Sequence, residues 1–509
     1  MTQPSFDLIE QPWIPVLYLD GATTENLGLR ALLHRAHELQ AIYGESPLVT
    51  AALYRFLLAL VYAIFDEPHT TREWQQIWQK GCFDKAAVDA YFARWQERFD
   101  LFHPKRPFFQ WPDKANREKQ AIDLFPDFAS GSNATLFDHH TTNDNTPLRA
   151  EQAARGLLQI MTFCTSGGAG LAPKESSDAP WARGCVFLAE GNTIFETLML
   201  NFLPPRDAGF QSNPQDRPFW ESKNPFEPLR SVPLGMRDYL SWPIRAVYLV
   251  PEQQDGQLVV RKVFMGTGLK LEEIEHPVYA YRERASDKKR LFQRFNENRA
   301  LWRDSSTFLN LKSNTSWPPK PIHWLAELVA EEILPRSQIY RVMVLGMANN
   351  QAKIDFYREE HFPLPGQYLQ QPELVEALNQ AITMAEDVRI ELERSISRLA
   401  TLLLWPTADG KNERKPDRKD IENLMGHWSS ERVYWGSLEP AFFTLLQTLP
   451  HNPQAALQTW WQTLRTASLK TFERTARMAG ENTRALRAAA RAENQLYGSL
   501  KKLFEPRKE

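Results

Sequence analysis

Three neighbouring amide side chains, Asn349, Asn350 and Gln351, stand between two β-rich runs of the sequence. The first run, 339–345, is rich in residues that favour strands, and the second, 353–357, alternates apolar and polar residues. This pattern predicts an antiparallel hairpin with the amides at its tip. Amides both donate and accept hydrogen bonds, so they suit the edges of nucleic-acid bases. An ordinary polar turn would give the same pattern, and both interpretations stay open at this point.

A second candidate is the glycine-rich segment that contains Gly167, Gly168, Ala169 and Gly170. Without side chains, another surface can approach this backbone closely. The backbone amides of such a segment can donate to phosphates or to base-edge acceptors. The alternative is a flexible surface loop.

The C-terminal part of the chain is basic. Residues 465–509 hold eleven Lys and Arg residues and five acids, a net charge of +6 in a chain whose formal net charge is −2. Four of these cations are spaced by seven residues: Lys470, Arg477, Arg484 and Arg491. On one helix they would share a face and could follow a row of phosphates. Gly480 and Asn482 interrupt the run, so the strip could instead span a helix turn, and a solvated face is the alternative.

Catalytic motifs are weak or absent in the sequence. Asp138, His139 and His140 could belong to a metal-dependent nuclease or phosphoesterase, but a polar loop explains three such residues equally well. His37 begins a zinc-protease pattern that fails, because Ala41 stands where the second His is required. Neither a phosphate-binding P-loop nor a serine-hydrolase elbow occurs. The residues alone therefore identify no particular enzyme activity and no cofactor, and the nuclease interpretation of 138–140 stays open.

Cysteine usage and hydropathy predict a soluble, cytoplasmic protein without membrane contact. The three cysteines are far apart and form no Cys-x-x-Cys pair, so no thiolate metal site is expected. No signal peptide is predicted. The most apolar stretch, 48–65, carries Arg55, which would cost about 2.5–3.5 kcal/mol inside a bilayer. Because Ser46 and Pro47 are typical of a helix start, we predict a buried core helix.

The elements that must position these residues fall into two regions. A chain of 509 residues exceeds one hydrophobic core. Short strands, helices and Pro-rich connections predict a mixed α/β (α+β) domain over 1–368, and long amphipathic helices with short loops predict an antiparallel bundle over 369–509. The expected helices are 28–41, 47–65, 70–79, 84–98, 150–163, 373–405, 420–427, 434–448, 453–478 and 482–504, and the expected strands include 246–250, 259–265 and 339–345.

Taken together, the sequence resembles CasA, the large subunit of the type I-E CRISPR surveillance complex Cascade. Trp13-Ile14-Pro15-Val16 is similar to the family's N-terminal strand, and Arg106-Pro107-Phe108-Phe109-Gln110 is similar to its His-Pro-Phe-Met-Gln segment. Glu431-Arg432-Val433-Tyr434-Trp435 resembles a motif of the helical domain. The resemblance implies that this domain, over 369–509, is an antiparallel four-helix bundle. Phe137 lies where the family's loop carries a Phe that meets the 5′ end of the guide RNA.

The resemblance implies a non-catalytic subunit that works with the other Cascade subunits and the CRISPR guide RNA. Such a subunit recognises the protospacer-adjacent motif of foreign double-stranded DNA from the minor groove. It then helps to open the duplex and provides a docking surface for the helicase-nuclease. Carried over, Gln351 is the wedge at the first base pair, flanked by Asn350 and Ala352, while Gly168 and Gly170 let the loop approach the motif.

The family also uses a lysine finger, for which Lys270 is the first choice and Lys262 the second. Some members hold a cysteine cluster just before this region, which this sequence lacks, so no metal is expected. Because the minor groove carries a degenerate code, such a reader should tolerate several motifs. Two alternatives stay open: a metal-dependent nuclease built on 138–140, and a helical scaffold that contacts only proteins.

Overall fold

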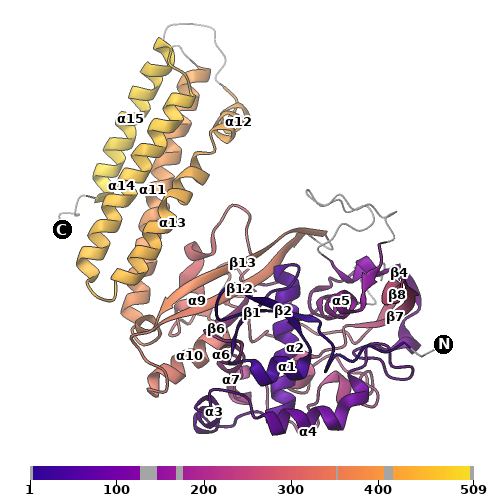
Figure 1. Cartoon of the computed structure of the whole chain (residues 1–509). Helices are drawn as coiled ribbons and strands as arrows, with labels where there is room; N and C mark the ends of the chain where they lie inside the picture. Colours follow the sequence, from indigo (N-terminus) through magenta and orange to yellow (C-terminus); the bar gives the residue numbers. More distant parts are fainter. Residues whose placement is uncertain (1–3, 127–145, 168–175, 351–352, 406–415, 505–509) are drawn as a thin grey trace. The chain divides into compact units, whose positions relative to one another are not determined.

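The computed structural model describes residues 4–126, 146–167, 176–350, 353–405 and 416–504 (Figure 1). The chain divides into two compact units. Unit 1 comprises 1–301 and 307–369, and it mixes helices with several small sheets. Unit 2 comprises 302–306 and 370–509, and its described elements are helices. The mixed α/β class predicted from the sequence is confirmed.

Helix α2, Pro47–Phe65, lies in the core of unit 1. The side chain of Ser46 accepts a hydrogen bond from the N–H of Val49, and Pro47 occupies the first turn, so both predicted start signals act here. By length and composition α2 could cross a membrane, but 83% of its apolar window is buried inside the fold. The prediction of a buried core helix is confirmed.

The first sheet of unit 1 is antiparallel, with the order β2-β1-β3. Its strands are Ile14–Tyr18, Thr24–Leu27 and Leu39–Ile42 for β1, β2 and β3. The helix predicted over 28–41 is wrong in its second half, because α1 covers only Leu29–Arg35. Residues 39–42 pair with β1 instead, so the tertiary pairing outweighs the local helical preference. The next predicted helices are confirmed as α3, Thr71–Trp78, and α4, Lys85–Trp95.

The second sheet carries the predicted amide hairpin and has the order β13-β12-β6. Strand β12, Ile339–Asn350, pairs antiparallel with β13, Lys353–Pro365, along its whole length. Strand β6, Val186–Glu190, pairs with β12 only between Arg341 and Leu345. Beyond Leu345 the two long strands therefore continue as a ribbon that β6 does not cover. The hairpin predicted for this region is confirmed in both of its strands.

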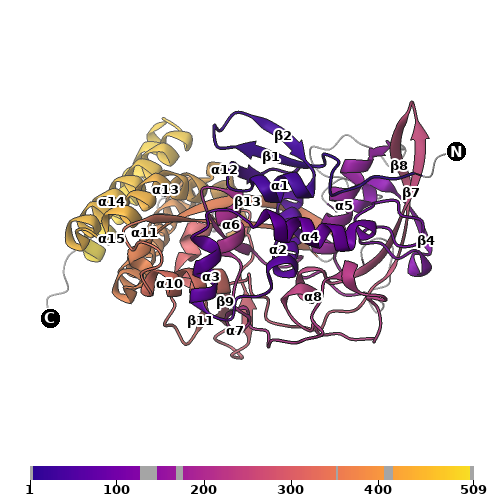
Figure 2. The same ribbon diagram turned by 60° about the horizontal axis from the view of Figure 1, so that its bottom comes forward.

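A second long hairpin consists of β7, Arg245–Gln254, and β8, Gln257–Thr267 (Figure 2). Strands β4, Arg117–Gln120, and β5, Leu148–Arg149, also pair with β8. A small sheet has the order β10-β9-β11, with strands Arg290–Phe292, Tyr281–Glu283 and Ser316–Trp317. The remaining short helices of the described residues are α6, Ile194–Leu200, α7, Pro205–Ala208, α8, Met236–Leu240, α9, Ser305–Leu309, and α10, Lys320–Ala330.

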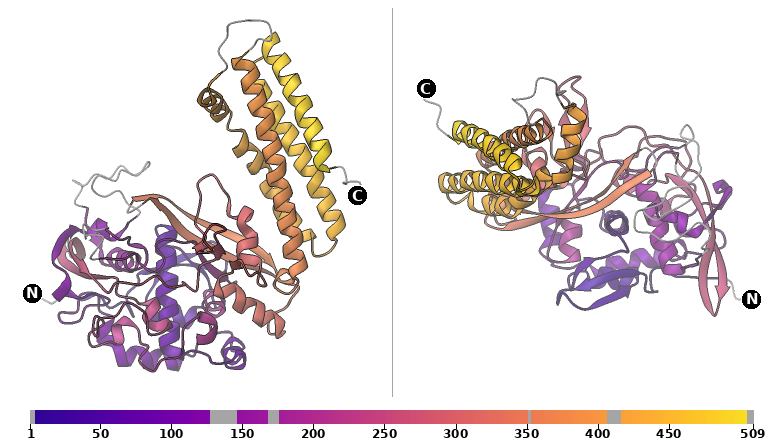
Figure 3. Two further views of the ribbon diagram at one scale, coloured as in Figure 1. Left: turned by 180° about the vertical axis from the view of Figure 1, so that it is seen from behind. Right: turned by 90° about the horizontal axis from the view of Figure 1, so that it is seen from above.

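Unit 2 is built from long helices that lie side by side (Figure 3). They are α11, Pro372–Leu404, α13, Ser430–Thr448, α14, Pro453–Met478, and α15, Thr483–Phe504. The shorter α12, Arg418–Trp428, lies between α11 and α13 in the sequence. Helix α11 packs against α14 and α15, and α13 packs against α14. Buried hydrogen bonds connect them, since Tyr434 and Trp460 donate to carbonyls of α11 at 2.9 Å. The helices lie close to the predicted ranges.

Candidate nucleic-acid interface

The glycine-rich segment follows helix α5, Ala150–Phe163, and both of its arms are held by hydrogen bonds. The first described arm ends at Gly167 and the second begins at Ser176, so Gly168 and Gly170 lie outside the described residues. The N–H of Gly167 donates to Oγ of Ser176 at 3.2 Å, and the hydroxyl of Ser166 donates to the carbonyl of Ser176 at 3.1 Å. Gly167 has a φ of +76°, which favours glycine. The two arms thus form a fixed base.

Arg245 holds the same two arms from inside the fold. It is the first residue of β7 and only 1% of its surface is exposed. Its guanidinium donates to the carbonyl of Thr165 on the first arm at 2.9 Å and to the carbonyl of Ser177 on the second arm at 3.3 Å. Because one rigid cation bonds both carbonyls, it fixes the separation of the arms.

A short path of contacts connects this base to the amide hairpin. Asp178 accepts from the N–H of Ser166 at 2.7 Å and from two nitrogens of Arg183 at 2.7 and 2.8 Å. The chain after Arg183 enters β6 and passes close to β12, where a Cβ at Gly346 would lie 2.9 Å from the carbonyl oxygen of Gly184. Gly346, with a φ of +156°, thus permits close approach at the point where the uncovered ribbon begins.

Lys270 lies in an exposed position beyond the end of β8. The residues on either side of it are anchored: the N–H of Leu269 donates to the carbonyl of Pro243 at 2.9 Å, and the N–H of Leu271 donates to Oγ of Ser177 at 2.8 Å. The second bond attaches the Lys270 segment to the base of the glycine-rich segment. The structure therefore brings these two candidate features together.

The other lysine candidate, Lys262, has a different environment. It lies within β8, and its ammonium is 2.9 Å from the carboxylate of Glu118. The hydrogen bond to Glu118 raises the pKa of the exposed Lys262 ammonium. The charge of Lys262 is thus balanced locally by Glu118, and the bond of Leu271 to Ser177 places the Lys270 segment at the base of the glycine-rich segment.

A cavity of about 830 Å³ opens beside the glycine-segment base. Both arms line it together with the segment 271–276 and the strands β9 and β10. Its cations are largely balanced, because Arg183 pairs with Asp178 and Arg290 pairs with Glu275. The cavity adds room beside the candidate reader but no strong excess of one charge.

The described hairpin ends at the pair formed by Asn350 and Lys353. Gln351 and Ala352, between these strands in the sequence, lie outside the described residues. The register shifts by one residue after Ala348, a bulge that increases the local twist of a ribbon. The views in Figures 1 and 3 agree that the free end of the ribbon lies on the side of unit 1 that carries α5.

His361 fastens the base of this ribbon to the neighbouring strand. Its Nδ1 lies 2.8 Å from the carboxylate of Glu190 on β6, and its Nε2 lies 3.0 Å from that of Glu359. Hydrogen bonds to these two carboxylates raise the pKa of the His361 imidazole to about 10. A protonated imidazole donates to both carboxylates at neutral pH. His361 on β13 is therefore bonded to Glu190 on β6 through a charged hydrogen bond.

The basic strip is divided between two helices. Lys470 and Arg477 lie on α14, whereas Arg484 and Arg491 lie on α15, and all four are exposed. The interpretation that they occupy one face of a single helix is therefore wrong. The strip instead continues across the connection between α14 and α15. The reason is local: α14 ends at Met478, and the side chain of Asn482 accepts from the N–H of Ala485 at the start of α15. Arg477 also pairs with Glu473 at 2.5 Å.

The alternative metal site falls on residues that the structure does not describe. Asp138, His139 and His140, together with the guide-RNA candidate Phe137, lie within 127–145. Among the described ranges, no group of three or more His, Cys, Asp and Glu side chains is arranged to hold a metal ion. The nuclease hypothesis thus rests on 138–140 alone.

Several residues that carried the resemblance have packing roles in the fold. The buried indole of Trp13 donates to the carbonyl of Leu8 at 2.9 Å. Gln110 is buried, donates to the carbonyl of Leu101 at 2.7 Å and accepts from the N–H of Leu249 at 2.8 Å. Trp13 and Gln110 therefore position the backbone around them.

Sequence reasoning missed the residues that support the site. The sequence pattern alone does not indicate Arg245 or Asp178. The available signal is that Arg245 directly precedes an apolar strand run, because a cation buried beside such a strand needs polar partners such as backbone carbonyls. From the sequence, Arg55 indicates only that this helix is unfavourable in a bilayer. Its guanidinium donates to the carbonyl of Met161 at 3.0 Å and to that of Tyr239 at 2.8 Å, so it holds the end of α5. Burial lowers the pKa of Arg55 to about 10.

Comparison with known proteins gives consistent results over nearly the whole chain. The family model described as CRISPR-associated protein Cse1 matches residues 7–471. The CRISPR-associated protein CasA/Cse1 of Thermus thermophilus is 34% identical over 523 aligned residues, which cover 98% of each chain. The crystal structure of Thermus thermophilus CasA superimposes with a TM-score of 0.81 at 29% identity, covering 98% of this chain and 100% of that one. A chain of a CRISPR RNA-guided surveillance complex in a pre-nicking state gives a TM-score of 0.65 at 25% identity, covering 97% and 99%.

Proposed function

The chain belongs to the family of the CRISPR-associated protein Cse1, and from this premise we propose that it is the large subunit of a type I-E Cascade complex. One of the solved structures that it resembles is a chain of a CRISPR RNA-guided surveillance complex. In the proposed role the chain recognises the protospacer-adjacent motif of invading double-stranded DNA from the minor groove. It then helps to open the duplex for pairing with the guide RNA.

The observation that supports the role most strongly is the attachment of the Lys270 segment to the base of the glycine-rich segment. The N–H of Leu271 donates to Oγ of Ser177 on one arm of that base. In the proposal, Gly167, Gly168 and Gly170 allow the loop to approach the minor groove, and Lys270 contacts the motif. A reader of this kind distinguishes A·T from G·C more readily than it distinguishes individual bases.

The amide hairpin supplies the proposed wedge. Gln351 inserts at the first base pair of the target, with Asn350 and Ala352 on either side. Separating base steps in this way costs a few kcal/mol, which contacts to phosphates can offset. Because DNA pairs are exchanged for RNA–DNA pairs at nearly balanced free energy, a wedge needs only to lower the barrier to the first exchange.

The rest of the chain has supporting roles in this proposal. Phe137 lies near the guide RNA within an N-terminal domain of residues 1–368. Residues 369–509 form the antiparallel four-helix bundle, in which Lys470, Arg477, Arg484 and Arg491 contact the DNA backbone. The subunit acts in the cytoplasm with the other Cascade subunits and helps to recruit the helicase-nuclease. It requires no cofactor and cuts no DNA itself.

Duplex binding by the assembled complex, with and without this chain, tests the proposal. We expect binding that depends on the motif only when the chain is present. Equal motif discrimination by a complex that lacks the chain would favour the protein-only scaffold. The same samples, incubated with Mg²⁺ or Mn²⁺ and no helicase-nuclease, should give no cut product. Cleavage that is lost in the Asp138→Ala variant would favour the nuclease alternative.

A further inference from the structure

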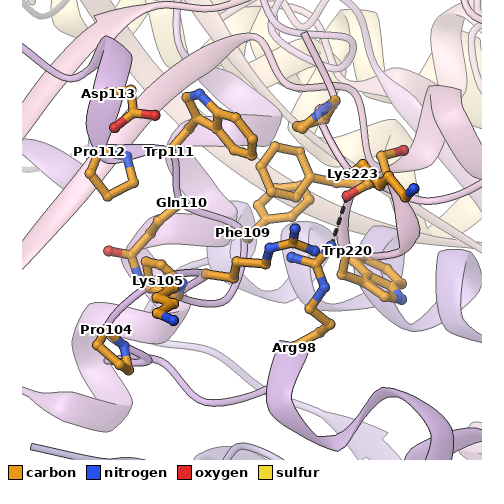
Figure 4. Close-up of a pocket in the computed structure, with 15 residues that line it drawn as sticks. Arg98, Pro104, Lys105, Phe109, Gln110, Trp111, Pro112, Asp113, Trp220 and Lys223 are labelled. Carbon is orange, nitrogen blue, oxygen red and sulfur yellow. Dashed lines mark hydrogen bonds between the residues drawn. The ribbon is translucent and has the colours of Figure 1, made fainter. Parts of the chain in front are cut away.

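A cavity of about 380 Å³ lies in unit 1 at the segment that resembles the family's His-Pro-Phe-Met-Gln run (Figure 4). Its walls come from Arg98, from the loop 104–113 and from the segment 219–225. Among the residues that the structure describes, neither Gly167 nor Lys270 lines it. The proposed reading of the motif therefore leaves this cavity without a role.

The cavity carries a strong excess of positive charge. Of the described residues that line it, four are cations, Arg98, Lys105, Arg106 and Lys223, and one is a carboxylate, Asp113. Figure 4 shows Lys105 and Lys223 on either side of Arg98, with Asp113 at the far side of the cavity from Arg98. Within the part of the chain that the structure describes, Lys105, Arg106 and Lys223 have no carboxylate partner.

The most enclosed cation is held in position by the protein. Arg98 is half-buried, and its guanidinium donates to the carbonyl of Ser222 at 2.8 Å. Burial and the nearby positive charge of Arg106 lower the pKa of Arg98. The carboxylate of Glu97 acts in the opposite direction, but burial and Arg106 outweigh it, so the two like charges still repel in a partly desolvated space. An anion placed between them would remove that cost.

The loop that presents Lys105 and Arg106 is held by hydrogen bonds within the protein. The ring nitrogen Nδ1 of His103 accepts from the N–H groups of Lys105 and Arg106, at 3.3 and 3.0 Å. Phe109 has a φ of +55°, an uncommon conformation for a large side chain. The neighbouring Gln110 is fixed by hydrogen bonds to the backbone at both ends of its amide. Strain of this kind persists only where the surroundings hold it, and such places cluster at binding sites.

Three of the aromatic residues at the cavity, Phe109, Phe219 and Trp220, are buried and form its wall rather than a platform for bases. Phe109 is 3% exposed and Trp220 is 2% exposed, and their ring centroids are 6.2 Å apart within an aromatic cluster. Rings that are covered in this way offer no free face on which a base could stack. The cations are therefore the main polar contacts that the described lining offers, which favours a charged group of a ligand, while Trp111 is the lining ring that is partly exposed.

We propose that this cavity binds a phosphodiester group of a single nucleic-acid strand. Arg98 and Arg106 would contact the phosphate oxygens, and Lys105 and Lys223 would contact the adjacent phosphates along the strand. The choice of a phosphate over a protein carboxylate rests on the proposed function. The guide RNA and the DNA target share this group, and the experiment below separates them.

Lysine acetylation followed by mass spectrometry tests the site in the full chain. The chain is treated with a limiting acetylating reagent in low salt, alone or with a 12-nucleotide single strand, as DNA or as RNA of the same sequence. Lys85, an exposed lysine on α4 away from the cavity, is the internal reference. We expect at least threefold less acetylation of both Lys105 and Lys223 relative to Lys85 when a strand is present. Protection by RNA alone would identify the guide as the source, and protection by DNA alone would identify the target.

Two variants and a competing polymer make the result decisive. Arg106 is exposed and has no described ion pair, so Arg106→Gln should fold normally yet lose most of the protection of Lys105 and Lys223. Arg72→Gln, an exposed arginine on α3, should keep the protection. The proposal is overturned if neither DNA nor RNA protects Lys105 and Lys223 from acetylation. It is also overturned if polyglutamate protects them equally well. Neither result depends on duplex opening. The proposal for this cavity can therefore be wrong while the wedge proposal is right, and the wedge proposal can be wrong while this one is right.

Discussion

The N–H of Leu271 donates a 2.8 Å hydrogen bond to Oγ of Ser177. This bond joins two segments that are far apart in the sequence, one carrying Lys270 and the other leading out of the glycine-rich segment. The same arm is bonded by Arg245 through the carbonyl of Ser177. The position of Lys270 is therefore set by the same contacts that set the base of the glycine-rich segment.

Replacing Lys270 with Ala should weaken motif-dependent duplex binding by the assembled complex about tenfold, as expected for one lost charged contact of roughly 1.4 kcal/mol. Binding to a duplex without the motif should change little. Lys262→Ala is the matched control, because it removes a lysine that is already paired with Glu118. The reverse outcome, with Lys262 essential and Lys270 dispensable, would reassign the finger. Filter binding or interferometry at fixed salt measures both.

Ser177→Ala should reduce motif-dependent binding without removing any proposed DNA contact. The change deletes the oxygen that accepts from Leu271, so the Lys270 segment loses one anchor while the bonds of Arg245 to the arms are kept. We expect a loss of about two- to fivefold in the wild-type background and little further loss when Lys270→Ala is already present. Fully additive effects would show that the two residues act separately. The four dissociation constants of this double-mutant cycle give the answer.

Arg245→Leu should loosen the base of the glycine-rich segment. The substitution leaves the buried carbonyls of Thr165 and Ser177 without this donor, at a cost of about 1–3 kcal/mol for each group that remains unpaired. Hydrogen exchange should become faster at the amides of 164–167 and 176–179 than in the rest of unit 1. Arg245→Lys, which keeps one donor, should give an intermediate rate. Unchanged exchange in the leucine variant would contradict the clamp.

His361 should remain protonated at neutral pH, because Glu190 and Glu359 raise the pKa of its imidazole to about 10. A raised folded-state pKa stabilises the fold fully below the unfolded value of about 6.5, and this contribution declines as the pH rises toward 10. The stability difference between the wild type and His361→Gln should therefore be largest below pH 6.5 and vanish above pH 10. Arg341, which also faces Glu190 at 3.5 Å, is unchanged by the substitution. Denaturant unfolding at several pH values tests this, and a difference that grows with pH would contradict it.

Replacing Arg477, Arg484 and Arg491 together with Gln should lessen the salt dependence of DNA binding by the complex. Each phosphate contact on B-form DNA contributes about 0.9 to the slope of log K against log salt, so three contacts would lower it by roughly 2–3. A matched triple replacement of Arg394, Arg398 and Arg432, exposed arginines on other helices of unit 2, should leave the slope unchanged. If the slope of log K against log salt is equal in the wild type and the first variant, the basic strip is only a solvated face of the helices.

The sequence predicted the long elements of the fold well, because their patterns are strong and local. Helix α5 and helix α14 coincide with the predicted 150–163 and 453–478. It failed at residues 39–42, where pairing with β1 decides the structure. The fold class follows from such patterns, whereas the division into functional domains at 368 stays a prediction.

The contacts that support the candidate site could not be predicted in the same way. Arg245 is hydrogen-bonded to Thr165, and Leu271 to Ser177, although each pair is far apart in the sequence. No local periodicity encodes such pairs, because they arise only when distant segments fold together. Lys270 was selected by resemblance, and its relation to the glycine-rich segment emerged only from the structure. The roles of Gln351, Ala352, Gly168 and Gly170 stay predictions.

The central claim, that the amide hairpin opens the target duplex, is tested most directly by a base analogue. A 2-aminopurine placed at the first base pair beside the motif becomes brighter when that pair unstacks. With the wild-type complex we expect a fast rise in fluorescence after binding. Gln351→Ala should slow this rise at least tenfold while initial binding changes less than threefold, and Gln257→Ala, at the tip of the β7–β8 hairpin, should behave like wild type. An unchanged rise with Gln351→Ala would contradict the account.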